Sequence, residues 1–567
     1  MINFKIVIMN KKNEFISSII FFISLIVSIN LHAQEKNKIP GLDSFISNIF
    51  KKLQIGTIPG TSVLVAQNGK IIYQNGFGYA NIEKKITVTP DTKFKIGSIS
   101  KQFTAVAILK LMEKGKIKID DKLSKYIPDF PRGDEVTIYQ LLTHTSGIHS
   151  FEYQQNFEMT KPITPKEQLE IIKNFPYDFN PGEHYMYNNS GYFILGYIVA
   201  QLSGKTLSEY LNDTFFKPLE MYNTGIYVTN NVLTNEAQGY VMIGDSVKKA
   251  DFQEMSWGLG VGNIYSTTKD LYKWNEAIFN GKVLTEKTLK LAFAQAILNS
   301  GGKVDYGFGW LLTTNKGLTF IQHSGVSNGF YSYIERQQEN KLTVCVLCNS
   351  LPTPEGINPV LNGQSISEFI LQDKMKKQKI AVETISENIL KKYVGRYNYG
   401  HGMVMMVTMK DKQLFGQMTA YESSPLIPIS QNEFYFKPQN AKIKFATDTS
   451  SIVDRLLQYQ DGEFFEASKL KDEVVIQINP AFFDRLTGKY DCGNNFVIEI
   501  LKENNKLYGT APNMPKFELL PTSELDYFMM EASSKVSFSL NKDGKAESLI
   551  LKFDGMSMPG KILIINK

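Results

Sequence analysis

The stretch Gly97–Thr104, which reads Gly-Ser-Ile-Ser-Lys-Gln-Phe-Thr, decides how this sequence is interpreted. It opens an apolar-periodic segment that runs to Met112 and stops at Gly115, a pattern typical of a helix with a glycine after its last turn. Ser98 stands at the predicted helix start, and Lys101, three residues later, shares one face of the first turn. A serine hydroxyl becomes a nucleophile when a base takes its proton, and a lysine does so when burial or another cation lowers its pKa. The stretch therefore offers a candidate serine nucleophile with a lysine beside it, and the surrounding sequence must support it.

The Ser-x-x-Lys pattern is not specific by itself, because this chain contains it six times, at Ser98, Ser246, Ser266, Ser300, Ser468 and Ser539. In the alternative interpretation Ser98 is only a helix cap and Lys101 a solvated residue of the first turn. A Gly-x-Ser-x-Gly pattern at 325–329 is rejected as a nucleophile elbow, because a strand follows it where an elbow needs a helix.

Four further segments follow Gly97–Thr104 along the chain. They are Leu-Leu-Thr-His-Thr-Ser-Gly at 141–147, Tyr-Asn-Asn-Ser-Gly-Tyr at 187–192, a glycine-rich turn into Ser-Thr-x-x-Asp at 260–270, and His-Ser-Gly at 323–325. In this order the five segments resemble those of serine beta-lactamases of the class C type and the related penicillin-binding peptidases and esterases. The resemblance covers about residues 40–350. It implies an α/β (α+β) domain with an antiparallel sheet flanked by helices and a helical subdomain.

The resemblance also implies catalytic roles. Ser98 attacks the substrate carbonyl, and Lys101 and Tyr187 share the work of general base and general acid. Tyrosine has an ordinary pKa near 10, so nearby cationic groups are needed to make it a useful base at neutral pH.

The substrate-binding residues implied by the resemblance surround this group. Asn189 orients Lys101 and the substrate amide, and His323 lies near Tyr187, where it polarises the tyrosine or holds substrate together with Ser324 and Gly325. The backbone N–H groups of Ser98 and Val326 form the oxyanion hole.

One departure from the pattern bears on the substrate. Most class C beta-lactamases have lysine where this chain has His323, whereas histidine is commoner in D,D-peptidases, D-aminopeptidases and esterases of the family. We therefore expect an exported serine hydrolase that forms an acyl-enzyme at Ser98 and acts on D-amino-acid peptides or beta-lactams. The alternatives are a carboxylesterase of the same family, or a non-catalytic protein that binds or senses cell-wall ligands.

Strand patterns occur at both ends of the first domain, which we place at residues 38–375. Thr61–Gln67 and Ile71–Phe77 flank the hairpin turn signal Asn68-Gly69, and β character returns at 319–324, 330–335 and 341–348. Strands at both ends with helices between them predict one sheet closed by the two ends of the segment.

The C-terminal third of the chain is a tandem repeat with a constant offset of 93 residues. Five landmarks recur: Gly395-Arg-Tyr and Gly488-Lys-Tyr, Leu414-Phe-Gly and Leu507-Tyr-Gly, Pro428 and Pro521, Phe445 and Phe538, and Asp461-Gly and Asp554-Gly. The repeats at 385–475 and 478–567 are therefore two copies of one all-β unit, each predicted to be a small antiparallel barrel or sandwich. They resemble the lipocalin-like barrels that are sometimes appended to enzymes of this kind.

The N-terminus has the features of a secretory signal peptide at residues 1–33. Lys11 and Lys12 precede the uncharged run Phe15–Leu31, and the small-residue end at Ala33 predicts cleavage there. We expect a periplasmic or secreted protein; the alternative is an uncleaved segment that anchors the protein to the membrane.

Composition excludes other classes of function. A net charge of +6 is spread over 567 residues without a basic stripe, so a nucleic-acid partner is not expected. The three cysteines do not form a disulfide framework, and Cys345 and Cys348 lie in a predicted buried strand. His144 and His149 lack a metal-ligand spacing, and His184 is expected to be exposed. No metal or cofactor is expected, and the expected partner is a small-molecule or peptide substrate.

Overall fold

A computed structural model describes most of the chain. The described residues are 39–55, 57–153, 159–229, 233–243, 246–375, 385–400, 403–419, 422–439, 441–447, 452–460, 463–493, 496–511, 516–530, 532–553 and 556–563. The predicted signal peptide and the Asp-Gly landmarks of the two repeats lie outside these residues. Among the described helices, none is long and apolar enough to cross a membrane.

The first domain is built on a six-stranded antiparallel sheet in the order β12-β13-β14-β15-β1-β2. The first hairpin forms at the predicted turn, where Asn68 and Gly69 have φ values of 53° and 76°. The N-terminal strand β1 pairs with β15 along its whole length, so the two ends of the segment close one sheet as predicted. The strands are β1 (Thr61–Gln67), β2 (Lys70–Phe77), β12 (Leu311–Asn315), β13 (Leu318–Ser327), β14 (Phe330–Gln337) and β15 (Leu342–Cys348).

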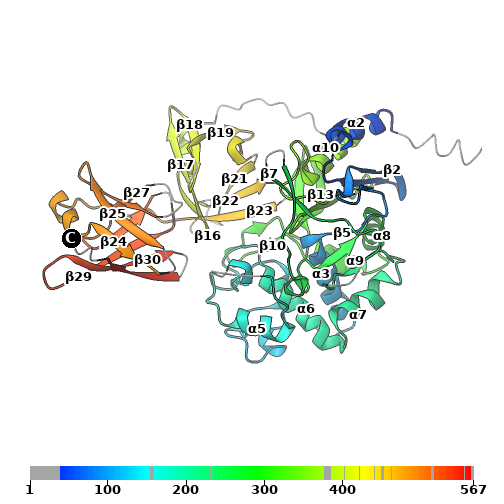
Figure 1. Cartoon of the computed structure of the whole chain (residues 1–567), viewed down its shortest axis with the longest axis horizontal. Coiled ribbons are helices and arrows are strands. Elements are labelled where there is room, and N and C mark those ends of the chain that lie inside the picture. The colour runs from blue at the N-terminus through cyan, green and yellow to red at the C-terminus, as the bar shows by residue number, and fades with distance from the viewer. Residues whose placement is uncertain are drawn as a thin grey trace, which may run out of the picture.

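Helices cover both faces of this sheet (Figure 1). Alternate residues of β15 enter two different cores: Cys345 packs with the core around α3, and Cys348 packs with the core beneath α2 and α10. Both thiols are buried and free, in agreement with their prediction as small core residues. The helices of the domain are α2 (Leu42–Ile49), α3 (Ser100–Glu113), α4 (Ile138–Leu142), α5 (Pro165–Lys173), α6 (Asn189–Ser203), α7 (Leu207–Leu211), α8 (Thr268–Phe279), α9 (Glu286–Ala292) and α10 (Pro359–Leu371).

The described part of the first domain also contains four small sheets apart from the six-stranded one. The small sheets are β3 with β4, β5 with β9 and β6, β7 with β8, and β10 with β11. These strands are β3 (Tyr79–Asn81), β4 (Ile86–Thr87), β5 (Phe94–Lys95), β6 (Gly225–Ile226), β7 (Tyr240–Ile243), β8 (Ser246–Lys249), β9 (Ile264–Ser266), β10 (Ala296–Ile297) and β11 (Lys303–Val304).

Two closed eight-stranded antiparallel barrels follow, so the fold class agrees with the prediction. Helix α11 (Glu387–Tyr393) leads into barrel 1, whose strands are β16 (Gly395–Gly400), β17 (Met403–Lys410), β18 (Gln413–Met418), β19 (Ser424–Pro428), β20 (Glu433–Phe436), β21 (Ala441–Thr447), β22 (Val453–Gln460) and β23 (Glu463–Lys469). Barrel 2 contains β24 (Gly488–Asp491), β25 (Val497–Glu503), β26 (Lys506–Thr510), β27 (Phe517–Pro521), β28 (Asp526–Met529), β29 (Lys535–Leu540), β30 (Ala546–Phe553) and β31 (Met556–Ile562).

Barrel 1 lies between the first domain and barrel 2 (Figure 1). Towards barrel 2, the buried guanidinium of Arg396 donates hydrogen bonds to the carbonyl oxygens of Met529, Met530 and Ala532. Towards the first domain, Leu457 of β22 joins an apolar cluster with Tyr185 and Tyr306. The three units therefore form one continuous structure.

Candidate active site

The segment that carries Ser98 is a tight turn pressed against strand β13. A 3-10 turn, Gly97–Ile99, precedes α3, which begins at Ser100, two residues later than predicted. Gly97 has a φ of +51°, and a Cβ on it would lie 2.4 Å from the Val326 carbonyl oxygen. A Cβ on Gly325 would lie 2.0 Å from the Ile96 carbonyl oxygen. Only glycine allows the two backbones to approach so closely. This contact brings Ser98 and Val326 to one place.

Lys101 connects the turn to the start of α6. Its Nζ lies 3.1 Å from Ser98 Oγ, 2.7 Å from Asn189 Oδ1 and 3.4 Å from the Val261 carbonyl oxygen. The lysine is 0% exposed, and the residue at the N-cap position of α3 is Ile99 rather than Ser98. Both observations contradict the alternative in which Ser98 caps a helix and Lys101 is solvated.

Asn189 is positioned by its neighbours at the start of α6. The Asn188 side chain caps this helix by accepting a bond from the Gly191 N–H at 2.7 Å, which makes Asn189 the first helical residue. The Asn189 Nδ2 donates to Glu152 Oε1 at 2.5 Å, and Ser150 Oγ donates to Glu152 Oε2 at 2.8 Å. The carboxylate thus fixes the amide so that its oxygen faces Lys101. Sequence reasoning missed Glu152, because it lies outside the five recognised segments.

Tyr187 lies beside the lysine in an aromatic cluster. Lys101 Nζ is 4.7 Å from the centroid of the Tyr187 ring. The His144 ring also packs against Tyr187, with 4.3 Å between the ring centroids and the two planes tilted by 39°. His144 is buried, and its Nδ1 accepts the Asn188 N–H at 3.0 Å. Burial and the charge of Lys101 lower the pKa of His144 well below its usual value, so this histidine is neutral. His144 is therefore an uncharged structural residue that supports the loop that carries Tyr187 and Asn188.

His323 lies near Tyr187, with 6.2 Å between ring centroids. Its Nε2 is 3.1 Å from the hydroxyl of Tyr306, and its Nδ1 is 2.5 Å from the Ser324 carbonyl oxygen. Burial, reinforced by the charge of Lys101 and opposed by the Ser324 carbonyl, lowers the pKa of His323 to about 3. His323 is therefore neutral near pH 7. Tyr306, which holds it, was missed by sequence reasoning because no motif contains it.

A pocket of about 510 Å³ opens onto Ser98. Of the predicted substrate-binding residues, Asn189 and the 44% exposed Val326 line it, whereas His323 and Ser324 are buried behind its wall and Gly325 packs against Ile96. Its remaining described lining residues include two carboxylates, Glu152 and Glu254, and the apolar side chains of Phe151, Met159, Phe252, Met255, Trp257, Val261 and Leu351. Within the described ranges, no group of three His, Cys, Asp or Glu residues is placed to hold a metal ion.

Comparison with known proteins places this geometry in a family. Residues 45–360 match the Beta-lactamase family, and residues 379–471 and 472–561 each match a domain of unknown function, DUF3471. The chain belongs to the beta-lactamase family. Members of this family, D-amino acid amidases among them, are serine hydrolases that act on small-molecule or peptide substrates.

Relatives of known sequence include two from Bacillus subtilis (strain 168). Penicillin-binding protein 4* is 28% identical over 460 residues, which cover 77% of this chain and 100% of the relative. The putative penicillin-binding protein PbpX is 32% identical over 330 residues, which cover 58% of this chain and 79% of the relative.

Solved structures of similar proteins include an octameric penicillin-binding protein homologue from Pyrococcus abyssi, with a TM-score of 0.51, 25% identity, and coverage of 76% of this chain and 99% of that chain. The D-amino acid amidase from Ochrobactrum anthropi SV3, complexed with L-phenylalanine amide, has a TM-score of 0.50 and 26% identity, and the match covers 58% of this chain and 96% of that chain.

Proposed function

We propose that this protein is an exported hydrolase that forms an acyl-enzyme at Ser98 and cleaves amide bonds of small D-amino-acid amides and peptides. The observation that carries the proposal is the 3.1 Å contact between Lys101 Nζ and Ser98 Oγ inside a buried, hydrogen-bonded group. A surface Ser-x-x-Lys copy such as the exposed one at Ser246 has no such surroundings.

In the proposed reaction, Ser98 Oγ attacks the carbonyl carbon, and its proton passes to the pair formed by Lys101 and Tyr187. The same pair gives a proton to the leaving nitrogen as the C–N bond breaks, which leaves an ester on Ser98. The N–H groups of Ser98 and Val326 stabilise the oxyanion. Water then attacks the ester carbon, which releases the acid and restores the serine hydroxyl.

The charge of the pocket favours a substrate with a free amino group. Glu152 and Glu254 line it, and no lysine or arginine is found among its described lining residues. A carboxylate-lined wall attracts an ammonium group and disfavours a terminal carboxylate near the scissile bond. This supports an aminopeptidase or amidase activity over a carboxypeptidase activity, and it agrees with the similarity to a D-amino acid amidase.

Labelling by a fluorescent penicillin and a fluorophosphonate, followed by intact mass spectrometry, tests the acyl-enzyme. Wild type and the control Ser246→Ala should gain the mass of one adduct, and Ser98→Ala should gain none. The lifetime of the penicillin adduct reports whether water removes the acyl group fast enough for beta-lactamase activity. An unlabelled wild type would favour the alternative of a ligand-binding protein.

Chromogenic substrates test the specificity. D-alanine p-nitroanilide should be hydrolysed at least about tenfold faster than its N-acetyl derivative, because acetylation removes the charge that the carboxylates attract. Glu254→Gln should slow only the free-amine substrate. Equal rates on both anilides, or a strong preference for p-nitrophenyl acetate, would favour the carboxylesterase alternative. Cell fractionation with an antibody tests export, which rests on the N-terminal sequence alone.

A further inference from the structure

We infer that barrel 1 positions the loop that carries Tyr187, and that its outer face therefore supports the active site from outside the substrate pocket. The inference rests on the proposed function, which gives Tyr187 a role in proton transfer. Residues 181–188 have no regular secondary structure, so other parts of the molecule must hold this loop. A group that transfers protons needs placement to within a fraction of an ångström, because small displacements cost large factors in rate.

The three residues before Tyr187 each contact barrel 1. The His184 Nδ1 lies 2.9 Å from the hydroxyl of Ser468 on β23, so His184 is half-buried and not exposed as predicted. Tyr185 is buried in the cluster that contains Leu457 of β22. Met186 covers Gly400 of β16, where a Cβ would lie 2.8 Å from its Cε. On the opposite side, the Met186 N–H donates to the His144 carbonyl oxygen. The loop is held between His144 and the barrel.

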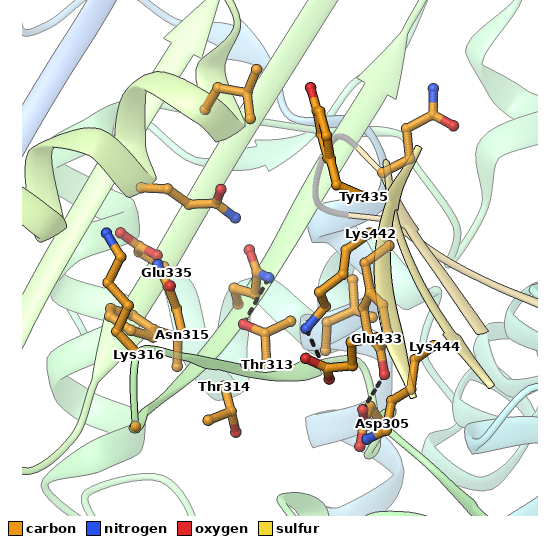
Figure 2. A pocket seen from close by; sticks show the side chains of 18 of the residues that line it. Asp305, Thr313, Thr314, Asn315, Lys316, Glu335, Glu433, Tyr435, Lys442 and Lys444 are labelled. Carbon is orange, nitrogen blue, oxygen red and sulfur yellow. Dashed lines mark hydrogen bonds and ion pairs between the residues drawn. The ribbon is translucent and has the colours of Figure 1, made fainter. Parts of the chain in front are cut away.

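Barrel 1 also contacts the segment that supports His323. The hydroxyl of Tyr459 on β22 donates a hydrogen bond to Asp305. Residues of the first domain and of barrel 1 line a shared pocket of about 670 Å³, and Figure 2 shows Asp305 among the side chains of that pocket. The Arg455 guanidinium lies against Gly302, 2.4 Å from where a Cβ would be. Tyr306, the residue after Asp305, makes the 3.1 Å contact with His323.

The two contact regions meet in one apolar cluster. Leu457 packs there with Tyr185 and Tyr306, and Tyr187 packs against the same group. The Tyr306 ring centroid is 5.9 Å from that of Tyr185 and 6.3 Å from that of Tyr187. If the barrel were displaced, Tyr185 and Tyr306, two side chains of the cluster against which Tyr187 packs, would both lose their contact with Leu457.

These contacts belong to barrel 1 and not to the barrel fold in general. At the offset of 93 residues, barrel 2 has Ile550, Lys552, Pro559 and Lys561 where barrel 1 has Leu457, Tyr459, Glu466 and Ser468. Lys552, Pro559 and Lys561 are exposed. The side chains that dock the first domain are thus found in only one of the two repeats.

The test uses the full chain with Leu457→Asp, which disrupts docking from outside the barrel core, and Ile550→Asp as the matched control. Rates are divided by the concentration of acylatable sites, titrated with a fluorophosphonate, so that unfolded protein is not counted. We expect Leu457→Asp to lower kcat at least about tenfold with KM changed less than about threefold, because none of the described barrel residues lines the substrate pocket. Ile550→Asp should stay within about twofold of wild type.

Tyr459→Phe and Ser468→Ala keep the barrel surface intact and should lower kcat about three- to tenfold and shift the pH profile of kcat. Hydrogen exchange of amides 184–188 gives a readout that does not depend on activity. Exchange should speed up in Leu457→Asp and stay unchanged in Ile550→Asp. Unchanged exchange, or unchanged kcat per site in all three barrel 1 variants, would overturn the inference. A wild type that no probe labels would instead refute the proposed function, while the exchange experiment would still decide the positioning.

Discussion

The two barrels share one fold and differ in what their outer faces touch. Their strands correspond at the offset of 93 residues, as β22 and β30, or β23 and β31, illustrate. Each barrel has a buried tyrosine whose hydroxyl donates to a carbonyl four residues earlier: Tyr397 to Tyr393 at 2.8 Å and Tyr490 to Leu486 at 2.7 Å. Yet barrel 1 contacts both the first domain and barrel 2.

The difference shows that the inward and outward residues of a strand serve separate purposes. Phe445 and Phe538 occupy equivalent positions in the two barrel cores. On the outside of the barrels, the equivalent residues Leu457 and Ile550 differ in burial, because Leu457 is 4% exposed and Ile550 is only half-buried. Because successive side chains of a strand point to opposite faces, one face can preserve the barrel while the other acquires a partner.

Truncating the chain after each unit should give the largest difference between the two barrels. A chain that ends at Lys471 lacks barrel 2 and should keep kcat/KM within about threefold of wild type. A chain that ends at Met375 lacks both barrels, exposes the cluster around Tyr185, and should lose about 100-fold or more. Hydrolysis of a p-nitroanilide per titrated site measures both. Equal losses in the two truncated chains would contradict a special role for barrel 1.

Arg396→Ala should weaken the contact between the barrels. Three carbonyl oxygens lose a charged donor, which should cost about 2–4 kcal/mol of barrel 2 stability. The matched change in barrel 2, Lys489→Ala, removes an exposed side chain and should change stability by less than about 0.5 kcal/mol. Calorimetry resolves the unfolding transition of each unit, and equal shifts in both variants would contradict the assignment.

Glu466→Gln should change the pH dependence of stability. Burial, opposed by Arg455 and the Tyr185 backbone and reinforced by Asp454, raises the pKa of Glu466 from 4.5 to about 7. The folded state therefore favours the protonated acid, so stability falls as pH rises from about 4.5 to about 7. Glutamine should gain about 3 kcal/mol at pH 8 and little at pH 4.5.

Thermal unfolding at the two pH values measures this effect. Glu547→Gln, an exposed glutamate of barrel 2, is the control and should show no gain at either pH. A Glu466→Gln gain that is the same at pH 4.5 and pH 8 would mean that the carboxyl does not titrate in this range.

Tyr397→Phe and Tyr490→Phe should give the smallest and most nearly equal effects. Each variant loses one buried hydroxyl-to-carbonyl bond, worth about 1 kcal/mol. Urea unfolding of the two variants should show matching losses. If one variant lost much more unfolding free energy than the other, this hydrogen bond would contribute differently to the stability of the two repeats.

Local sequence patterns were enough to predict several elements of the first domain. The hairpin turn at Asn68-Gly69, the buried strand with Cys345 and the helix stop at Gly115 all depend on short-range preferences, and each forms where expected. The repeats were visible because five landmarks kept one offset. Glu152 and Tyr306 escaped detection because each acts through one contact with a distant residue, for which a single sequence holds no periodic signal.

The sequence by itself determined the fold class, the tandem barrels and the segments that hold Ser98, Lys101, Tyr187, Asn189 and His323, because these depend on residue order and on patterns repeated along the chain. The tertiary structure alone decided which of six Ser-x-x-Lys copies is buried beside an amide, that His323 is neutral and bonded to Tyr306, and that one barrel docks beneath the Tyr187 loop. Burial and contacts between distant segments set these properties, since they change charge and position without changing local sequence.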